Sequence, residues 1–151
     1  MAGMTLGAAL EREHREIDSG IETYLAQSDD RNSLQRAMAG LRRHIYLEEA
    51  FLFPPLRAAG MFGPIMVMLR EHGELWQTME GLDAQLADGA AAEQSCRRLL
   101  GLLARHNEKE EPIVYPQADQ VLPGQDAADL HAFLRSGDLP PGWVCQAAGA
   151  R

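Results

Sequence analysis

The stretch HIYLEEAFLFP, residues 44 to 54, decides the fold, because it returns in outline as HNEKEEPIVYP at residues 106 to 116. Both stretches read His-x3-Glu-Glu-x3-(Phe/Tyr)-Pro. Two shorter stretches, EREHREI around His14 and LREHGEL around His72, also resemble each other. The order along the chain is therefore short, long, short, long, which indicates two helical hairpins related by pseudo-symmetry.

Composition narrows the classes of protein to consider. A chain of 151 residues makes one domain, and a net charge of −8 with a pI near 5.0 argues against a nucleic-acid binder, because no basic stripe can neutralise phosphates. The longest apolar stretch, residues 61–69, is too short to span a membrane. The first residues turn acidic before the core of a signal peptide could develop, and Cys96 and Cys145 form no CxxC motif. We therefore expect a cytoplasmic protein with reduced thiols.

Apolar residues recur every three to four positions in four stripes, over residues 6–25, 34–52, 65–86 and 99–113. Turn signals separate the stripes at residues 27–33, 60–64 and 88–91. This pattern predicts an all-α protein, an antiparallel up-down-up-down four-helix bundle over residues 1–120. Residues 121–151 contain a short helix after Gly124 and a Pro/Gly-rich tail, and we expect them to pack on the bundle as a C-terminal extension.

Polar residues occupy the buried phase of these stripes. His14, His44, His72 and His106 all fall in register with the apolar residues, although an unpartnered buried polar group costs several kcal/mol. In a helix, residues four apart lie about 40 degrees apart around the axis, so each long phrase can aim its histidine and its first glutamate, Glu48 or Glu110, at one point. The second glutamate of each pair, Glu49 or Glu111, is turned about 140 degrees away, toward the flank of the helix.

Imidazole nitrogens with carboxylate oxygens suit first-row metals, and bundle cores host carboxylate-bridged di-iron centres. A single histidine on an apolar face is more often a packed core residue than a ligand, but four in phase, two of them with a glutamate, favour metal binding. A two-metal site also explains the repeat, because each long phrase supplies a histidine and a bridging carboxylate. His131 lies outside the stripes, so we expect a surface or packing role for it.

Taken in order, these residues resemble the hemerythrin-like family, also called the HHE cation-binding domain, over roughly residues 5 to 120. The resemblance implies a four-helix bundle that holds two iron ions joined by an oxo or hydroxo bridge. It also implies the ligand set, with Glu48 and Glu110 as bridging carboxylates. The ligands would be His14, His44, Glu48, His72, His106 and Glu110.

The chain departs from the pattern of the oxygen-carrying members of that family. Those members carry two histidines one turn apart on the third helix, but the residue four after His72 is Trp76. Their last carboxylate lies five residues after its histidine, which keeps Glu111 open as an alternative to Glu110. Pro112 removes a helical hydrogen bond and should kink the fourth helix.

Another group can replace the missing nitrogen donor. Asp18, one turn after His14, can act as a further ligand or as an acceptor behind a ligand. Tyr24, Tyr46 or Tyr115 could supply a phenolate, but none lies in ideal phase with the ligands of its helix. Tyr46 is about 200 degrees from His44, so its inward aim would need an irregular helix. We therefore expect these tyrosines to pack in the core or to present a surface hydroxyl.

A centre that lacks one histidine favours chemistry with a small oxidant, namely hydrogen peroxide, dioxygen or nitric oxide, over oxygen carriage. Catalase-like, peroxidase-like or nitric oxide-reacting activity is one hypothesis. A reversible oxygen-binding or iron- or oxygen-sensing module, in which the extension signals to a protein partner, is the second. A metal-free or zinc-stabilised helical interaction protein is the third.

Overall fold

The computed structural model describes residues 4–149, and within that range it contains helices and turns but no strand. The all-α class expected from the sequence is confirmed. No helix in this described range is long and apolar enough to cross a membrane.

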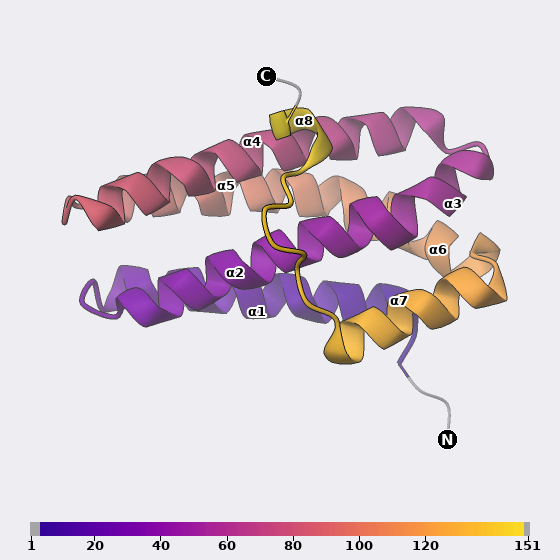
Figure 1. Ribbon diagram of the computed structural model, residues 1–151, viewed down its shortest axis with the longest axis horizontal. Coiled ribbons are helices and arrows are strands. Elements are labelled where there is room, and N and C mark those ends of the chain that lie inside the picture. The colour runs from indigo at the N-terminus through magenta and orange to yellow at the C-terminus, as the bar shows by residue number, and fades with distance from the viewer. Residues whose placement is uncertain (1–3, 150–151) are drawn as a thin grey trace.

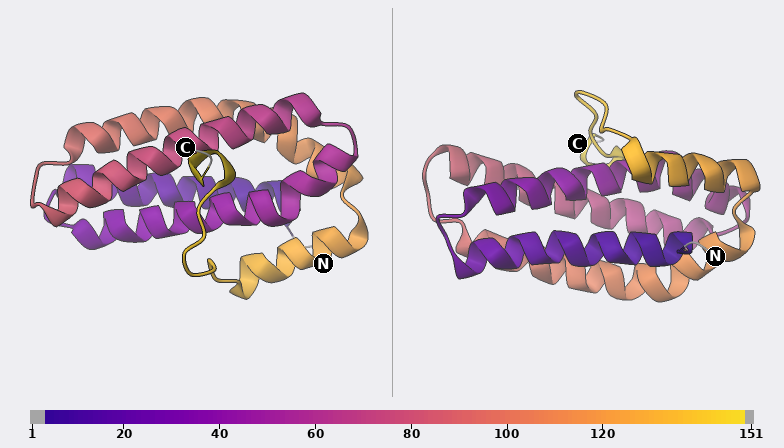
Figure 2. Two further views of the ribbon diagram at one scale, coloured as in Figure 1. Left: turned by 45° about the horizontal axis from the view of Figure 1, so that its top comes forward. Right: turned by 90° about the horizontal axis from the view of Figure 1, so that it is seen from below.

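The helices between Leu6 and Val121 fall into four consecutive rods. These rods lie side by side (Figures 1 and 2). The first and third rods are single helices, and the second and fourth are each interrupted by one π-helical turn. The first rod is α1 (Leu6–Ala26) and the third is α4 (Phe62–Ala87). The second rod comprises α2 (Arg31–Leu47), η1 (Glu48–Leu52) and α3 (Phe53–Ala58). The fourth comprises α5 (Glu93–Lys109), η2 (Glu110–Val114) and α6 (Tyr115–Val121).

Capping residues and turn glycines mark where helices begin and end. The side chain of Thr5 accepts the N–H of Ala8 at 3.1 Å, and the side chain of Asp30 accepts the N–H of Ser33 at the same distance, so each caps a helix. Gly60 and Gly89 have φ angles of 102° and 67°, a region that favours glycine, and they form the turns after α3 and α4. Short connections of this kind keep successive rods adjacent.

The two π-turns fall at the same place in the two long phrases. In η1 the N–H of Phe53 bonds the carbonyl of Glu48, and in η2 the N–H of Tyr115 bonds the carbonyl of Glu110, so each bond spans five residues. A proline, Pro54 or Pro116, follows each aromatic residue. Proline lacks the N–H and its ring clashes with the carbonyl four residues back, so a widened turn before it relieves the clash. The predicted irregularity of the fourth helix is therefore a π-turn.

The apolar core consists of two clusters. One contains Ile17, Ile45, Leu75 and Leu103, and the other contains Leu10, Leu47, Leu69 and Val114. Along α1, His14 stands between Leu10 of one cluster and Ile17 of the other. His72 stands between Leu69 and Leu75 in the same way. The polar residues of the core thus form a layer between two apolar clusters, which shields them from water.

The chain continues past the fourth rod as α7 (Gly124–Ser136), a tail, and α8 (Gln146–Gly149). The tail crosses over α2, and α8 lies against α4 (Figure 1, yellow). Leu130, Cys145 and Ala148 are buried, so this part of the chain is packed on the rods.

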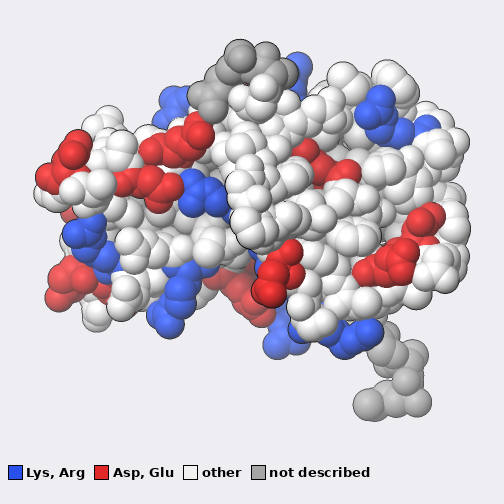
Figure 3. All heavy atoms as spheres, viewed as in Figure 1, with Lys and Arg blue, Asp and Glu red and all other residues white. Residues whose placement is uncertain are grey.

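Acidic and basic side chains are interspersed on the face shown in Figure 3. Ion pairs on the surface include Arg42 with Asp83 at 2.7 Å and Arg12 with Glu16 at 3.4 Å. The excess of acidic residues is therefore spread over this face among cations instead of forming one continuous acidic field.

Candidate metal centre

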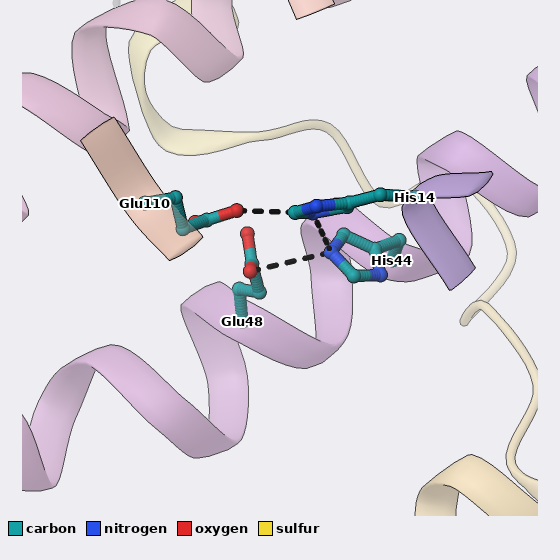
Figure 4. Close-up of side chains that lie close together, drawn as sticks. All are labelled: His14, His44, Glu48 and Glu110. Atoms are coloured by element: carbon teal, nitrogen blue, oxygen red, sulfur yellow. Dashed lines mark hydrogen bonds and ion pairs between the residues drawn. The ribbon is translucent and has the colours of Figure 1, made fainter. Parts of the chain in front are cut away.

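Six side chains from all four rods meet in the buried polar layer. They form two groups in which the metal-binding atoms lie within 4.8 Å of one another, and both groups share Glu48 and Glu110. One group adds His14 and His44, which Figure 4 shows with the two glutamates, and the other adds His72 and His106. The structure therefore brings together all six residues that the sequence singled out as ligands.

On the side of α1 and α2, the Nε2 atoms of His14 and His44 face each other at 3.1 Å. His44 Nε2 lies 3.3 Å from Glu48 Oε2, and His14 Nε2 lies 3.1 Å from Glu110 Oε1 (Figure 4). Four donor atoms from three rods thus enclose one point.

On the side of α4 and α5, the rings of His72 and His106 stand 5.2 Å apart. His72 Nε2 lies 3.0 Å from Glu48 Oε1, and His106 Nε2 lies 3.4 Å from Glu110 Oε1. The two oxygens of Glu48 therefore face different histidine pairs, as a bridging carboxylate requires. Glu110 approaches both pairs with Oε1, and its Oε2 is buried without a hydrogen-bond partner.

Each imidazole directs its other nitrogen, Nδ1, at a further carboxylate. We call these the outer carboxylates. For His44, His72 and His106, the outer carboxylate lies on the rod just before the rod of the histidine. For His14, on the first rod, it lies on the last rod. The pairs are His44 with Glu13 at 2.8 Å, His72 with Glu49 at 2.8 Å, His106 with Glu71 at 2.9 Å and His14 with Glu111 at 2.7 Å. A donated Nδ1–H fixes the tautomer and ring orientation that leave Nε2 free for a metal.

Tyr115 is buried in the core, but the phase argument that turned its hydroxyl away from the ligands was wrong. Its hydroxyl lies in the centre, where it donates to Glu48 Oε2 at 2.6 Å and stands 2.9 Å from His14 Nε2 and from Glu110 Oε1. The reason is η2: in an α-helix Tyr115 would be turned about 140 degrees from Glu110, but the five-residue turn brings it back above Glu110. The equivalent residue of the other phrase is Phe53, whose ring stacks on His72 at 5.4 Å and has no oxygen.

The other candidates lie at the edge of the centre or outside it. Glu111 is an outer carboxylate, whereas Glu110 belongs to both donor groups. Asp18 is half-buried and belongs to neither donor group; burial raises its pKa, the nearby Glu22 and Glu111 raise it further, and His14 opposes this. The described ring contacts of Trp76 are with Trp143 and Arg42.

Tyr46 and His131 are both outside the donor groups. Tyr46 packs edge-on against Trp143 at 5.0 Å and beside Phe133 at 5.3 Å, so it supports the C-terminal extension instead of the metal ligands. His131 is on α7 and partly buried. The packing role expected for Tyr46 agrees with these contacts.

Neighbouring carboxylates raise the pKa of two buried histidines, His44 and His106, and so favour their protonated form when no metal is bound. Burial alone would lower the pKa of His44, but the charge of Glu48 and hydrogen bonds to Glu13 and Glu48 raise it to about 10. Burial opposes protonation of His106 as well, and Glu110 with Glu71 raises its pKa to about 10. Protons therefore occupy nitrogens that a metal cation would take over.

The pKa values of the buried oxygen groups Glu48 and Tyr115 shift in opposite directions. Burial and the charge of Glu110 favour protonation of Glu48, but His44 and His72 hold its pKa below the usual value. Burial raises the pKa of Tyr115 well above 10, and the charges of Glu110 and Glu48 add to this, so its phenol keeps its proton in the metal-free protein. The centre thus presents two carboxylates and one neutral phenol.

The donor set fits two first-row metal cations. Four imidazole nitrogens and two shared carboxylates suit borderline metals such as iron or zinc. The unpartnered Oε2 of Glu110 supports this fit, because a buried carboxylate oxygen without a hydrogen bond is costly unless a cation satisfies it.

Sequence reasoning missed Glu13, Glu49 and Glu71 as partners of the histidines. A signal was present: both short phrases contain Glu-His, and both long phrases contain Glu-Glu. The flank orientation predicted for the second glutamate is what lets Glu49 reach His72 on the neighbouring rod. The spacing within one helix cannot identify an acceptor that serves the next helix.

Comparison with known proteins agrees with this centre. A family model described as the hemerythrin HHE cation binding domain matches residues 5–118, which are 114 of the 151 residues. Neither the curated proteins nor the solved structures include a significant match to the chain.

Proposed function

The chain belongs to the hemerythrin HHE cation-binding domain family, and from this premise we propose that it holds two iron ions and reacts with small oxidants. The oxidants are hydrogen peroxide, dioxygen or nitric oxide. The single observation that carries the proposal is the pair of buried donor groups that share Glu48 and Glu110.

The ligand roles follow from the distances. His14 and His44 would hold one iron, His72 and His106 the other, and Glu48 would bridge them, since its two oxygens face different pairs. Glu110 would be the second bridge, with Glu111 behind His14. We further propose an oxo or hydroxo bridge between the ions, by resemblance to the family.

The fold around the centre is part of the same proposal. Short turns join successive rods, which supports the antiparallel up-down-up-down four-helix topology expected from the sequence. Residues 1–120 would form the metal-binding bundle and residues 121–151 the extension.

The two halves of the centre differ in one donor. Beside His14 and His44, Tyr115 contributes a phenol oxygen that holds a proton and donates it to Glu48 at 2.6 Å. Beside His72 and His106, the ring of Phe53 contributes no donor atom and covers the imidazole of His72. The exchangeable position for a small oxidant is therefore proposed on the side of His72 and His106, where Phe53 also excludes water.

A bound pair of irons supplies electrons and a Lewis-acidic position for such a ligand. The chain's own contribution is a dry, fixed donor set: the outer carboxylates orient the imidazoles, and Tyr115 holds one proton next to both bridging carboxylates. Steady turnover is favoured over oxygen storage because Trp76 packs against Trp143 where carrier-type members have a further histidine.

The test combines metal analysis with reactivity. Protein produced with iron should contain about two irons per chain and show an optical band of a bridged di-iron centre. The iron-loaded protein should consume hydrogen peroxide or nitric oxide faster than a variant that lacks His106 and Glu110. Absence of bound iron would refute the metal assignment. If the variant consumed hydrogen peroxide and nitric oxide as fast as the iron-loaded protein does, the proposed reactivity would be refuted.

A stable, reversible oxygen adduct of the reduced protein, without turnover, would instead establish the carrier or sensor alternative. Zinc as the only metal retained would support the interaction protein with a structural metal. Each of these outcomes excludes the proposed reactivity.

A further inference from the structure

The C-terminal extension is linked by hydrogen bonds to two of the four outer carboxylates, directly to Glu49 and through Arg43 of α2 to Glu13. We call residues 133–149 the C-terminal clasp; they comprise the end of α7, the tail and α8. The clasp lies over α2 and reaches α4 (Figures 1 and 2).

The first contact runs through Arg43. Its guanidinium donates to the carbonyls of Gly137 at 2.8 Å and Leu134 at 3.0 Å, and also to that of Phe133, at the C-terminal end of α7. The same guanidinium donates to Glu13 Oε2 at 3.2 Å, and Glu13 Oε1 accepts the Nδ1–H of His44 at 2.8 Å. The clasp is therefore joined to His44 by three consecutive polar contacts, through Arg43 and Glu13.

The second contact is direct. The backbone N–H of Gln146, the first residue of α8, donates to Glu49 Oε1 at 3.0 Å. Glu49 Oε2 accepts the Nδ1–H of His72 at 2.8 Å, and Glu49 has a side-chain exposure of 7%. A backbone donor thus fixes the carboxylate that orients His72.

Close packing keeps α8 at this position. A Cβ atom placed on Gly73, the residue after His72, would lie 2.7 Å from the Cβ of Ala147, so only glycine allows this approach. Trp143 packs edge-on against Tyr46 at 5.0 Å and Trp76 at 5.4 Å. Trp76, which replaces a histidine of the carrier-type pattern, therefore anchors the clasp.

The other two outer carboxylates are held without the clasp. Glu71, behind His106, is paired with Lys109 of the neighbouring rod. Glu111, behind His14, has a side-chain exposure of 31%. Within residues 4–149, the polar contacts of the clasp therefore reach one histidine of each donor group, His44 in one and His72 in the other.

We propose that the C-terminal clasp is a positioning element of the metal centre, which holds His44 and His72 in their metal-binding orientation through Glu13 and Glu49. The consequence for metal affinity rests on the function proposed above, whereas the contacts with the outer carboxylates do not. Removal of a partner behind a ligand typically weakens metal binding by 10- to 100-fold, and the clasp acts one contact further out, so we expect about tenfold.

Gln146→Pro tests the direct contact. It deletes only the N–H that Glu49 accepts, and proline is tolerated at the first position of a helix. The matched control is Gln146→Ala, which changes the side chain but keeps the N–H. Arg43→Gln tests the other contact, with Arg97→Gln as its control, because Arg97 is an exposed arginine on α5.

The first readout needs no metal: the Nδ1–H proton resonances of the four histidines, observed by NMR. In Gln146→Pro the His72 resonance should shift while that of His106 stays; in Arg43→Gln the His44 resonance should shift. The control variants should leave both unchanged. If the His72 resonance is the same in Gln146→Pro and Gln146→Ala, the direct contact is refuted.

The second readout is competition between the protein and a chelator for Co²⁺. Gln146→Pro and Arg43→Gln should each weaken binding about tenfold relative to their controls. If wild-type protein binds no metal but the histidine resonances shift as expected, the proposed function fails and the contacts of the clasp stand. If wild-type protein binds two metals and all variants bind them equally, the clasp has no positioning role.

Discussion

At the scale of single residues, one oxygen atom distinguishes the two halves of the centre. Tyr115 and Phe53 occupy equivalent places in the two long phrases and stack on equivalent histidines, Tyr115 on His14 and Phe53 on His72. The phenol oxygen of Tyr115 lies within 3.1 Å of four polar side chains. The pseudo-symmetric repeat therefore produces a centre with two chemically different sides.

Tyr115→Phe should keep the fold, because phenylalanine already stands at the equivalent position 53. It should lower the unfolding free energy of the metal-free protein by about 1–3 kcal/mol, because the buried Oε2 of Glu48 loses its hydroxyl donor. Denaturant unfolding measures this change. Tyr24→Phe, a buried tyrosine outside the centre, is the control, and an equal loss in both variants would contradict a special role for Tyr115.

The raised pKa values of His44 and His106 predict that the stability of the metal-free protein depends on pH. The pKa of His44 and of His106 is raised to about 10 in the folded chain, above the value of about 6.5 in an unfolded one. A raised pKa adds stability that is fully present below pH 6.5 and is lost as the pH rises toward 10. Thermal unfolding of the metal-free protein should therefore occur at progressively lower temperature over this interval.

His106→Gln is the comparison for that experiment. One of the two groups no longer titrates in this variant, so the slope of stability against pH should be shallower than in the wild-type protein. Identical slopes would show that the general repulsion among the excess acidic residues, and not the buried histidines, causes the decline.

At this scale the sequence was informative where one helix decides the geometry. His44 with Glu48 and His106 with Glu110 could be assigned to the buried face from their spacing alone. The position of Tyr115 in the centre could not be predicted, because the spacing rule assumes an α-helix and η2 is not one. The roles of Glu13 and Glu71 could not be predicted either, because each binds a histidine on another rod, and contacts between rods depend on their packing.

At the scale of elements, the π-turns deserve a physical explanation. The four helices and the turns between them follow from the apolar period and the helix breakers. The sequence predicted a kink only in the fourth helix, at Pro112, and it did not predict the π-turn of the second. In the structure a π-turn precedes each of the prolines that end the long phrases, Pro54 and Pro116, which avoids the clash and turns the aromatic residue toward the centre. Deleting one residue from a π-turn can separate these two effects, the avoidance of the proline clash and the orientation of the aromatic residue.

Deletion of Ile113, which is exposed, should convert η2 into an α-helical turn. Tyr115 would then be four residues after Glu110 and still face the centre, but Pro116 would lie inside an α-helix at a cost of about 3 kcal/mol. Adding Pro116→Ala to the deletion should recover most of that loss. Denaturant unfolding of the two variants measures the difference.

Deletion of Ala104, also exposed but within α5, is the control. It rotates the two parts of that rod by about 100 degrees relative to each other, so it should disrupt the core whether or not Pro116 is replaced. If Pro116→Ala fails to restore stability to the Ile113 deletion, proline is not the reason for the π-turn.

At the scale of the whole molecule, the centre links all four rods. Each rod contributes at least one of the six donor residues, and each outer carboxylate ties one rod to the next. Without metal, protonated His44 and His106 face ionised Glu48 and Glu110 between the two apolar clusters. A bound cation replaces those protons and adds its binding free energy to the stability of the whole fold.

Metal removal should therefore destabilise the whole molecule. At free iron(II) of about 100 times the dissociation constant, each site adds about 2.7 kcal/mol, and a chain of this size gains about 2–4 °C in Tm per kcal/mol. Anaerobic iron(II) should thus raise Tm by at least about 5 °C over the chelated protein.

Glu48→Ala should abolish the response and lower the Tm of the metal-free protein as well, because buried imidazolium groups lose a counter-charge. Glu74→Ala, an exposed position on α4, should respond like the wild type; a full iron response in Glu48→Ala would exclude Glu48 as a bridging ligand.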